Sequence, residues 1–585
     1  YRVCVTMETA EGRLKRDVIN IALAPPPEPA ARGEFGWSLA GDEIPMPLDE
    51  LAKLLPRVAI HWVKLPVWYS SQHPEQGDAY AMLAERLAAA EIEVVGVIDR
   101  PPADSDLARR LSPEAAIADT LTSDPASWMP LLDPVLTRLS LRVRWWQLGG
   151  DGDTSLAAVP NVESELAQLR GKLFRFGQEV SLGIGWPWNQ AEAGTAAWQF
   201  QQYWASPALT GAELGAYLQT PPRAGVRRWV LVEPLPRSQY DLEARARDLV
   251  AQMLAAKMHG ADGIFAAQPF DDERGLMTDA GSPSELLLPW RTTAAMLGGA
   301  KYLGAAPLPG GSHNRLFERP DGSIVMAVWS DSPTREVLYL GDDVRVHDVW
   351  GRQQPAVRQG DEQVIAVDSA PRFVVGLDPY IARWRQRATF AKRHVPSIFG
   401  QSHANQLQIH NAFPQGVSGY VELHPPHGWQ VSPGRIDFKL SAGETALRSF
   451  DVSLPFDAPG GPAPVRADFV IEADRQYRFS VVRTLEVGDG QIQLETNTRL
   501  DDDGSLVVEQ RMANYGSSAP DFKCLLYAPG GRRRQRTHVV RLGASPDVKI
   551  YRYAHGAELI GAELWLRAQE VDGPRVLNHR FVVEP

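Results

Sequence analysis

The chain has 585 residues, which is too long for one hydrophobic core and suggests about three or four domains. Its hydrophobic fraction of 44% and charged fraction of 22% are typical of a globular protein, and no apolar run is long enough to span a membrane. The net charge of −11 excludes a basic nucleic-acid-binding surface, and we interpret the short run Arg532–Arg536 as a solvated loop.

The cysteine and histidine content argues against a metal site or a cofactor bound through such residues. The two cysteines, Cys4 and Cys524, lie far apart in the sequence, so a disulfide framework is not expected. The 13 histidines show no HExxH spacing or other regular ligand spacing. The chain begins at Tyr1 within a strand-like segment, so we expect its natural start and any export signal to lie outside this sequence.

Residues 1–32 are expected to form a β-hairpin followed by a stiff linker. An alternating segment at Tyr1–Met7 is followed by a turn at Glu11-Gly12 and a second apolar segment at Asp17–Leu23. The proline-rich stretch Pro25–Pro29 then predicts a linker. We interpret the hairpin as the end of an N-terminal β domain or as a strand pair packed on its neighbour.

Residues 33–305 alternate strand-like and helix-like segments, which predicts a (β/α)₈ TIM barrel. A doubly wound open sheet is the alternative, but no G-x-G-x-x-G follows the first strand. The longest predicted helix covers Tyr240–His259 and ends at Gly260. The predicted strands are Phe35–Leu39, Ala59–Leu65, Glu93–Ile98, Arg142–Leu148, Glu179–Ile184, Leu214–Leu218, Trp229–Val232 and Gly263–Ala267.

Helical periodicity nearly disappears after residue 305, which predicts a β-rich C-terminal half. Short strands separated by Gly, Asp and Pro turns indicate a small β domain at 306–380 packed on the barrel. The basic and polar stretch 381–395 is interpreted as a linker. The strand spacing of 396–488 and 489–585 is typical of two β-sandwiches of the immunoglobulin or fibronectin kind.

Two predicted barrel strands end at a carboxylate. The segment Trp145–Asp151 reads as a buried strand that stops at Asp151, and Arg228–Pro234 reads as a strand that stops at Glu233. The carboxyl ends of all strands in such a barrel open on one face, which carries the chemistry. Two acids delivered there can act as proton donor and nucleophile on a glycosidic bond.

These segments resemble a known family, the retaining glycoside hydrolases of the large (β/α)₈ superfamily (clan A), nearest to family-39-type enzymes. Trp146–Gly152 occupies the register of the family's fourth strand, whose final Glu is the acid/base, and Val232–Pro234 occupies that of its nucleophile. The closing helix at Pro289–Leu303 and the β domain behind the barrel are also similar. The likeness covers roughly residues 35–380 and implies a sugar substrate.

The resemblance implies that Glu233 is the nucleophile and Asp151 the acid/base of a double displacement. Glu233 would attack the anomeric carbon while Asp151, holding its proton near neutrality, protonates the leaving oxygen. Two departures matter: Gly150 replaces the family's Asn, and Asp151 is one methylene shorter than Glu. Asp153 is an alternative acid if the glycine-rich loop bends toward the cleft.

Six further residues are candidates for substrate binding because they lie at or after predicted strand ends. Trp side chains there can stack on sugar rings, and polar side chains can bind hydroxyl or acidic groups. For each of them, core packing or an internal ion pair is the alternative. The six are Lys64, Trp68, Trp186, Trp188, Tyr217 and Gln268.

The sequence therefore predicts a secreted glycoside hydrolase that cleaves a polysaccharide or oligosaccharide by a retaining mechanism, without a metal or other cofactor. The carbohydrate is the expected partner; nucleic acid is not, and the oligomeric state is left open. The alternative is a catalytically inactive carbohydrate-binding or scaffold protein that keeps the barrel. A metal-dependent barrel hydrolase is disfavoured because no strand end supplies a His-x-His pair.

Overall fold

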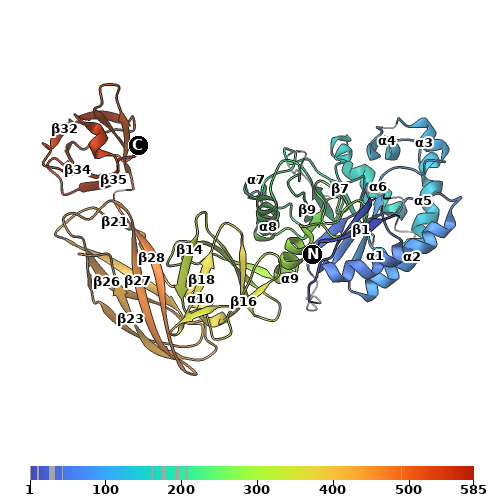
Figure 1. Ribbon diagram of the computed structural model, residues 1–585, viewed down its shortest axis with the longest axis horizontal. Coiled ribbons are helices and arrows are strands. Elements are labelled where there is room, and N and C mark those ends of the chain that lie inside the picture. The colour runs from blue at the N-terminus through green and yellow to red at the C-terminus, as the bar shows by residue number, and fades with distance from the viewer. Residues whose placement is uncertain are drawn as a thin grey trace.

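Figure 1 shows the computed structural model. A barrel surrounded by helices lies at one end, and β-rich units follow toward the C-terminus at the other end. The structure describes residues 2–9, 12, 14–25, 33–41, 44–112, 114–160, 162–173, 180–190, 197–205, 207–488 and 490–584. Residues 26–32 of the predicted proline-rich linker lie outside these ranges. Within them, no helix is long and apolar enough to cross a membrane.

Eight parallel strands close into a barrel, in the order β10-β3-β4-β5-β6-β7-β8-β9, which confirms the predicted TIM-barrel fold. Nearly every strand residue is buried, because the barrel interior lies on one side and the surrounding helices on the other. The strands are β3 (Phe35–Ser38), β4 (Trp62–Pro66), β5 (Glu93–Ile98), β6 (Trp145–Leu148), β7 (Ser181–Gly185), β8 (Phe200–Tyr203), β9 (Arg227–Val232) and β10 (Gly263–Ala266).

The predicted sixth strand at Leu214–Leu218 was wrong. This segment lies in helix α7 (Gly211–Tyr217), whose N-terminus is closed by a capping box: Thr210 Oγ1 accepts from the Glu213 N–H, and the Glu213 carboxylate accepts from the Thr210 N–H. The strand at this place in the barrel is β8, whose two glutamines gave it a polar sequence although all four residues are buried.

Helices cover the outside of the barrel. The longest, α8, spans Leu242–Met258, begins at the N-cap Asp241 and ends just before Gly260, in agreement with the helix predicted there. The others are α1 (Leu48–Leu54), α2 (Pro74–Ala89), α3 (Asp106–Arg110), α4 (Ile117–Leu121), α5 (Pro125–Leu139), α6 (Val162–Leu173), α7 and α9 (Leu287–Leu297).

An aromatic cluster fills the barrel interior. Trp229 stacks on Phe200 with ring centroids 3.7 Å apart, and it lies within 5.8 Å of Trp62, Trp145 and Phe265 as well. Several of the many tryptophans of the sequence are thus core residues rather than ligand contacts. Because this layer is packed, the two ends of the barrel are separate surfaces.

A β domain follows the barrel and contains two antiparallel sheets. The larger sheet has the order β11-β12-β13-β19-β15-β16 and the smaller has the order β14-β18-β17. Their strands are β11 (Lys301–Gly304), β12 (His313–Glu318), β13 (Ile324–Trp329), β14 (Thr334–Leu338), β15 (Arg345–His347), β16 (Gln353–Pro355), β17 (Val357–Gln359), β18 (Glu362–Val367) and β19 (Arg372–Leu377).

The stretch 381–395, predicted as a linker, is instead part of a folded domain. Helix α10 (Pro379–Arg387) inserts the fully buried Trp384 against Phe438 and Phe469 of the next sandwich. The prediction failed because three arginines dominate the composition of this helix, although one of them, Arg385, is buried and donates to the Tyr339 and Ser480 carbonyls. Short strands at Thr389–Phe390 (β20) and His394–Val395 (β21) then join the sandwich sheets.

Two β-sandwiches complete the chain, as predicted. The first packs the sheet β20-β22-β26-β24 on the sheet β21-β28-β27-β23-β25, and the second packs β29-β30-β33 on β32-β31-β34-β35. Their remaining strands are β22 (Ser402–His410), β23 (Val417–His424), β24 (Gln430–Ser432), β25 (Arg435–Leu440), β26 (Thr445–Ser453), β27 (Gly461–Glu472), β28 (Gln476–Val487), β29 (Ile492–Leu500), β30 (Leu506–Asn514), β31 (Phe522–Tyr527), β32 (Gln535–Val539), β33 (Asp547–Tyr553), β34 (Glu563–Glu570) and β35 (Val576–Val582). At the other end of the chain, β1 (Arg2–Glu8) and β2 (Leu14–Asn20) form an antiparallel hairpin.

Candidate active site

Glu233 immediately follows the last residue of β9, so its carboxylate lies at the carboxyl end of the barrel. The residue is 6% exposed. Its backbone is fixed by Gln252 of α8, whose side-chain oxygen accepts from the Glu233 N–H at 3.2 Å and whose amide donates to the Glu233 carbonyl at 3.0 Å. These two bonds hold the position of Glu233 without using its carboxylate.

The Glu233 carboxylate is held by two donors from different parts of the barrel. Arg274 forms an ion pair with Oε1, and the indole N–H of Trp204 donates to Oε2 at 3.0 Å. Both donors favour the ionised carboxylate and fix its orientation. An ionised and oriented carboxylate is what a nucleophile requires.

Arg274 reaches Glu233 from the loop that follows β10. In this loop, the Asp271 carboxylate accepts from the backbone N–H groups of Glu273 and Arg274, at 2.9 and 2.7 Å. The Arg274 side chain is 38% exposed, so it covers the carboxylate from the solvent side. Access of a substrate to Oε1 therefore requires Arg274 to rotate away or to bind the substrate itself.

Asp151 lies at the same end of the barrel, three residues after β6, and is bound to a buried cation. Its Oδ1 is 3.4 Å from Nζ of Lys64, which is completely buried in β4. The Gln202 side chain donates to the Asp151 carbonyl at 2.8 Å, and the Gln147 amide lies 3.5 Å from Oδ1. Lys64, predicted as a substrate-binding residue, thus serves first as the counter-ion of Asp151.

Lys64 occupies an unusual place for a cation. Its ammonium group lies 4.3 Å from the centroid of the Phe265 ring and 5.6 Å from that of Trp229, inside the aromatic layer of the barrel. Burial lowers the pKa of Lys64 to about 8, although the negative charge of Asp151 partly opposes the shift. This amine therefore titrates close to the physiological range.

The lowered pKa predicts a specific pH dependence of stability. Below pH 8 Lys64 is charged in both the folded and the unfolded chain, so folding carries the full cost of burying its charge. Between about pH 8 and the usual pKa of 10.5 the unfolded chain binds more protons than the folded chain, so the free energy of unfolding rises with pH. The full gain is about 3 kcal/mol.

The measurement is urea unfolding from pH 7 to 10.5, followed by tryptophan fluorescence. A Lys64→Met/Asp151→Leu double variant is the reference, because it cancels the titration of other groups. As the pH rises, the free energy of unfolding of the native protein should increase relative to that of the double variant. A difference that stays constant would show that Lys64 has an ordinary pKa.

Trp204 connects the two carboxylate positions. Its five-membered ring donates to Glu233, and its six-membered ring packs on Gly152, where an added Cβ would lie only 2.4 Å from Cζ3. A side chain at position 152 would therefore displace the indole. Trp204 thus contacts Glu233 directly and Gly152, the residue after Asp151, so both predicted catalytic acids border one part of the barrel mouth.

The other acids near Asp151 have different environments. Asp153 accepts from the backbone N–H groups of Ile117 and Ser155, at 2.7 and 2.8 Å, and so anchors the loop in which it lies. Asp99 accepts from the Gly150 N–H at 3.0 Å. Burial raises the pKa of Asp99 above its ordinary value, and the nearby Asp153 and Asp151 add to this effect.

Several buried oxygen atoms around Asp151 lack a hydrogen-bond partner among the described residues. They are Ser38 Oγ, Gln147 Oε1, Asp151 Oδ2 and Gln202 Oε1. Ser38 pairs with Lys64 across β3 and β4, and the other three belong to the Asp151 network. Buried polar atoms normally acquire a partner, so this cluster can receive hydrogen bonds from water or from ligand hydroxyls.

The predicted tryptophans have different surroundings. Trp186 is buried and packs on Trp198, with centroids 5.6 Å apart, so in this structure it belongs to the core. Trp188 is half-buried and lies 4.8 Å from the Tyr203 ring. It shares with Glu233 a recess of about 10 Å³, which is room for about one water molecule.

The three other predicted binding residues are not directly joined to the two carboxylates. Trp68 is half-buried and packs on the barrel core. Tyr217 is 50% exposed at the end of α7, not after a strand, and its ring lies 5.6 Å from that of Trp188. Gln268 is exposed after β10, with a positive φ of 42°. No ion pair or hydrogen bond joins Trp68, Tyr217 or Gln268 to Asp151 or Glu233 within the described ranges.

Sequence reasoning missed three residues that contact Glu233: Trp204, Gln252 and Arg274. Trp204 was missed because the sixth strand was placed too late; it directly follows β8, as a residue at a strand end should. Arg274 had a weak signal as the one cation in Asp271-Asp272-Glu273-Arg274. Gln252 lies on a helix, and nothing in its sequence indicated an inward role. In the described parts of the chain, no group of three or more His, Cys, Asp or Glu could hold a metal ion.

Comparison with known proteins gives no family. No family model matches the chain, and no curated protein matches it. Similar solved structures include an alpha-amylase from H. orenii, with 10% identity, a TM-score of 0.38, and coverage of 60% of this chain and 100% of that one. A bacterial orthologue of human α-L-iduronidase has 9% identity, a TM-score of 0.32, and coverage of 94% and 98%. A β-glucuronidase 2 variant from Bacteroides uniformis has 8% identity, a TM-score of 0.31, and coverage of 100% and 69%.

Proposed function

We propose that the protein is a glycoside hydrolase that cleaves an oligosaccharide or polysaccharide by a retaining double displacement, as family-39-like enzymes do. The observation that supports this most is the position of Asp151 and Glu233 at the carboxyl end of the barrel, where Trp204 donates to Glu233 and packs on Gly152, the residue after Asp151. This end of a TIM barrel carries the active site in such enzymes.

In the proposed reaction, Glu233 attacks the anomeric carbon and the bond from that carbon to the leaving oxygen breaks. Asp151 donates a proton to the leaving oxygen, and the sugar remains bound to Glu233 as an ester. Asp151 then takes a proton from water as the water attacks the same carbon and releases Glu233. The unpaired oxygens of Ser38, Gln147 and Gln202 are suited to accept hydrogen bonds from sugar hydroxyls.

One observation favours the alternative, a carbohydrate-binding protein without catalysis. A general acid must be free to give its proton to the leaving oxygen, whereas Oδ1 of Asp151 already lies 3.4 Å from the buried Lys64 ammonium. In the alternative the Lys64–Asp151 pair is structural, and the mouth of the barrel only binds sugar. The two functions differ in whether a covalent intermediate forms.

The test is covalent trapping with a panel of 2-deoxy-2-fluoroglycosyl fluorides, followed by mass spectrometry of the intact chain and its peptides. The fluorine at C2 slows both formation and hydrolysis of the glycosyl ester. The fluoride leaving group restores the rate of formation only, so the ester on the nucleophile accumulates. We expect an adduct on the peptide that contains Glu233. Glu50→Gln, which changes an exposed carboxylate on α1, should label equally well.

Three results have different meanings. An adduct on Glu233 supports the hydrolase and identifies the sugar. An adduct on another carboxylate contradicts the assigned nucleophile. Failure of every reagent to label the chain, together with measurable binding of the parent sugars, would support the non-catalytic protein instead.

A further inference from the structure

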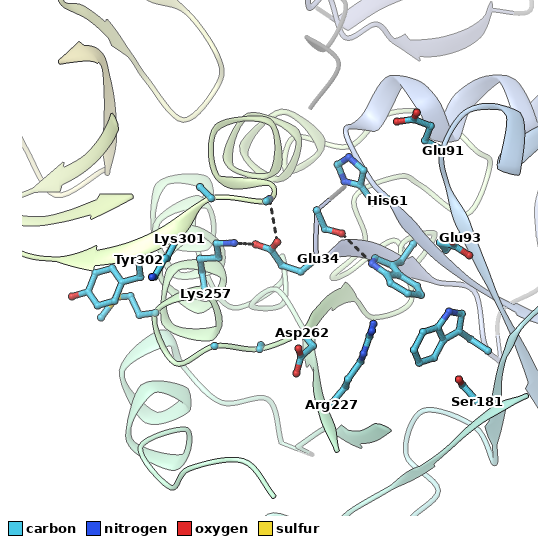
Figure 2. Close-up of a pocket in the computed structure, with 18 of the residues that line it drawn as sticks. Glu34, His61, Glu91, Glu93, Ser181, Arg227, Lys257, Asp262, Lys301 and Tyr302 are labelled. Carbon is cyan, nitrogen blue, oxygen red and sulfur yellow. Dashed lines mark hydrogen bonds and ion pairs between the residues drawn. The ribbon is translucent and has the colours of Figure 1, made fainter. Parts of the chain in front are cut away.

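A cavity of about 840 Å³ lies at the amino-terminal end of the barrel. It lies at the opposite end from Asp151 and Glu233. Figure 2 shows Arg227 extending between Asp262 and Ser181, with Glu34 and Lys257 on one side and Glu93 on another. Five of its lining residues are the first residues of barrel strands: Trp62, Glu93, Trp145, Ser181 and Arg227.

The cavity is hollow because small residues surround it, and it is closed toward the barrel interior. The lining includes Gly33, Gly260, Ala261, Gly299 and Ala300, which leave space that larger side chains would fill. The aromatic layer of the barrel, which includes Trp62 and Trp145, separates it from the candidate active site. A ligand here would therefore bind independently of the chemistry at the other end.

Two arginines in this cavity have no carboxylate partner in the described part of the chain. Arg227 stacks on Trp145, with its guanidinium carbon 4.6 Å from the ring centroid, and Arg144 directly precedes the same tryptophan. Among the described residues, no carboxylate lies within ion-pair distance of either side chain. A guanidinium that stacks on an indole keeps its edge free, and this edge binds carboxylate, sulfate or phosphate through two parallel hydrogen bonds.

Other charged residues also line the cavity. Lys257 forms an ion pair with Glu34, and an Asp262 oxygen accepts from the Arg228 backbone N–H at 2.9 Å. The remaining charged residues of the lining are Glu91, Glu93 and Lys301. The two guanidinium groups, in contrast, belong to Arg144 and Arg227 beside Trp145, and a ligand with one anionic group can pair with both of them.

We propose that this cavity is a second binding site, for a sugar that carries a carboxylate or sulfate group. Its anionic group would bind between Arg144 and Arg227, while the ring would lie along the aromatic and polar lining that includes Ser181 and Tyr302. The volume is within the range of about 300–1,000 Å³ found for small-molecule sites, so it admits a sugar rather than an inorganic ion alone.

The test is titration calorimetry with four probes: glucuronic acid, glucose 6-sulfate, glucose and inorganic sulfate. One or both acidic sugars should bind, and glucose should bind at least about tenfold more weakly, because it lacks the charged hydrogen-bond acceptor. Which acidic sugar binds more tightly distinguishes a carboxylate ligand from a sulfate ligand. None of the probes contains a glycosidic bond, so a protein that hydrolyses nothing gives the same result.

Arg144→Gln and Arg227→Gln should each weaken binding of the acidic sugar by about tenfold or more. Arg142→Gln is the matched control: it removes the same charge two residues from Arg144, but its side chain pairs with Glu85 outside the cavity. Because Arg227 is exposed, its variant should keep the native melting temperature. The proposal would be overturned if all three variants bound the acidic sugar as tightly as the native protein does, or if neither acidic sugar bound. It would also be overturned if glucose or inorganic sulfate bound as tightly as the acidic sugars.

Discussion

Replacement of Glu233 by glutamine is expected to lower kcat on the sugar identified by trapping by about 10⁴-fold, which corresponds to about 5 kcal/mol of transition-state stabilisation. The amide keeps the size of the side chain and can still contact Trp204, but it cannot form the glycosyl ester. Steady-state kinetics on an activated aryl glycoside measures the effect. Glu50→Gln is the control, since it removes an exposed carboxylate far from the barrel mouth.

A second variant separates a nucleophile from a merely structural carboxylate. Glu233→Ala removes the side chain and leaves room for a small anion, so added azide should restore turnover and give a glycosyl azide of inverted configuration. A structural role for Glu233 predicts no such rescue. If Glu233→Gln retained more than about a tenth of the native kcat, the assignment of the nucleophile would be wrong.

Arg274 gives this experiment a further structural meaning. In the structure it pairs with the Glu233 oxygen that an attacking nucleophile must present. Since the arginine is partly exposed and belongs to a loop, it can move without disturbing the barrel. The buried contacts from Gln252 and Trp204, in contrast, keep Glu233 in place. Gln252 and Trp204 thus fix Glu233 in position, and Arg274 covers its carboxylate on the solvent side.

The sequence was sufficient to predict the barrel and the strand ends that carry Asp151 and Glu233. In both segments an apolar run of strand length stops at a carboxylate, and a closed parallel barrel leaves few places for such a run. β8 was missed because Gln201 and Gln202 are polar although buried. Their burial depends on neighbouring strands and the Asp151 loop, which no local pattern records.

The surroundings of the carboxylates were less predictable than their positions. Lys64 was predicted to bind substrate, and the ion pair that it forms with Asp151 joins residues 87 positions apart. Trp186 reads as an exposed strand-end residue, yet Trp198 covers it. Such contacts arise from the closing of the barrel and from the paths of its loops, so local sequence patterns do not determine them.

The buried pair Lys64–Asp151 predicts the largest effect of a single substitution on stability. Asp151→Leu should lower the free energy of unfolding by about 1–3 kcal/mol near neutral pH, because it leaves the buried Lys64 ammonium without its counter-ion. Replacement of both partners in Lys64→Met/Asp151→Leu should recover much of this loss, since the double variant buries no charge and keeps a similar volume.

Urea unfolding followed by tryptophan fluorescence reports mainly on the barrel, where most tryptophans lie. The four proteins of the double-mutant cycle are the native chain, the two single variants and the double variant. A coupling energy below about 0.5 kcal/mol would mean that Lys64 and Asp151 are each satisfied without the other. In that case the ion pair with Lys64 would not restrain Asp151, and the strongest structural objection to Asp151 as the proton donor would disappear.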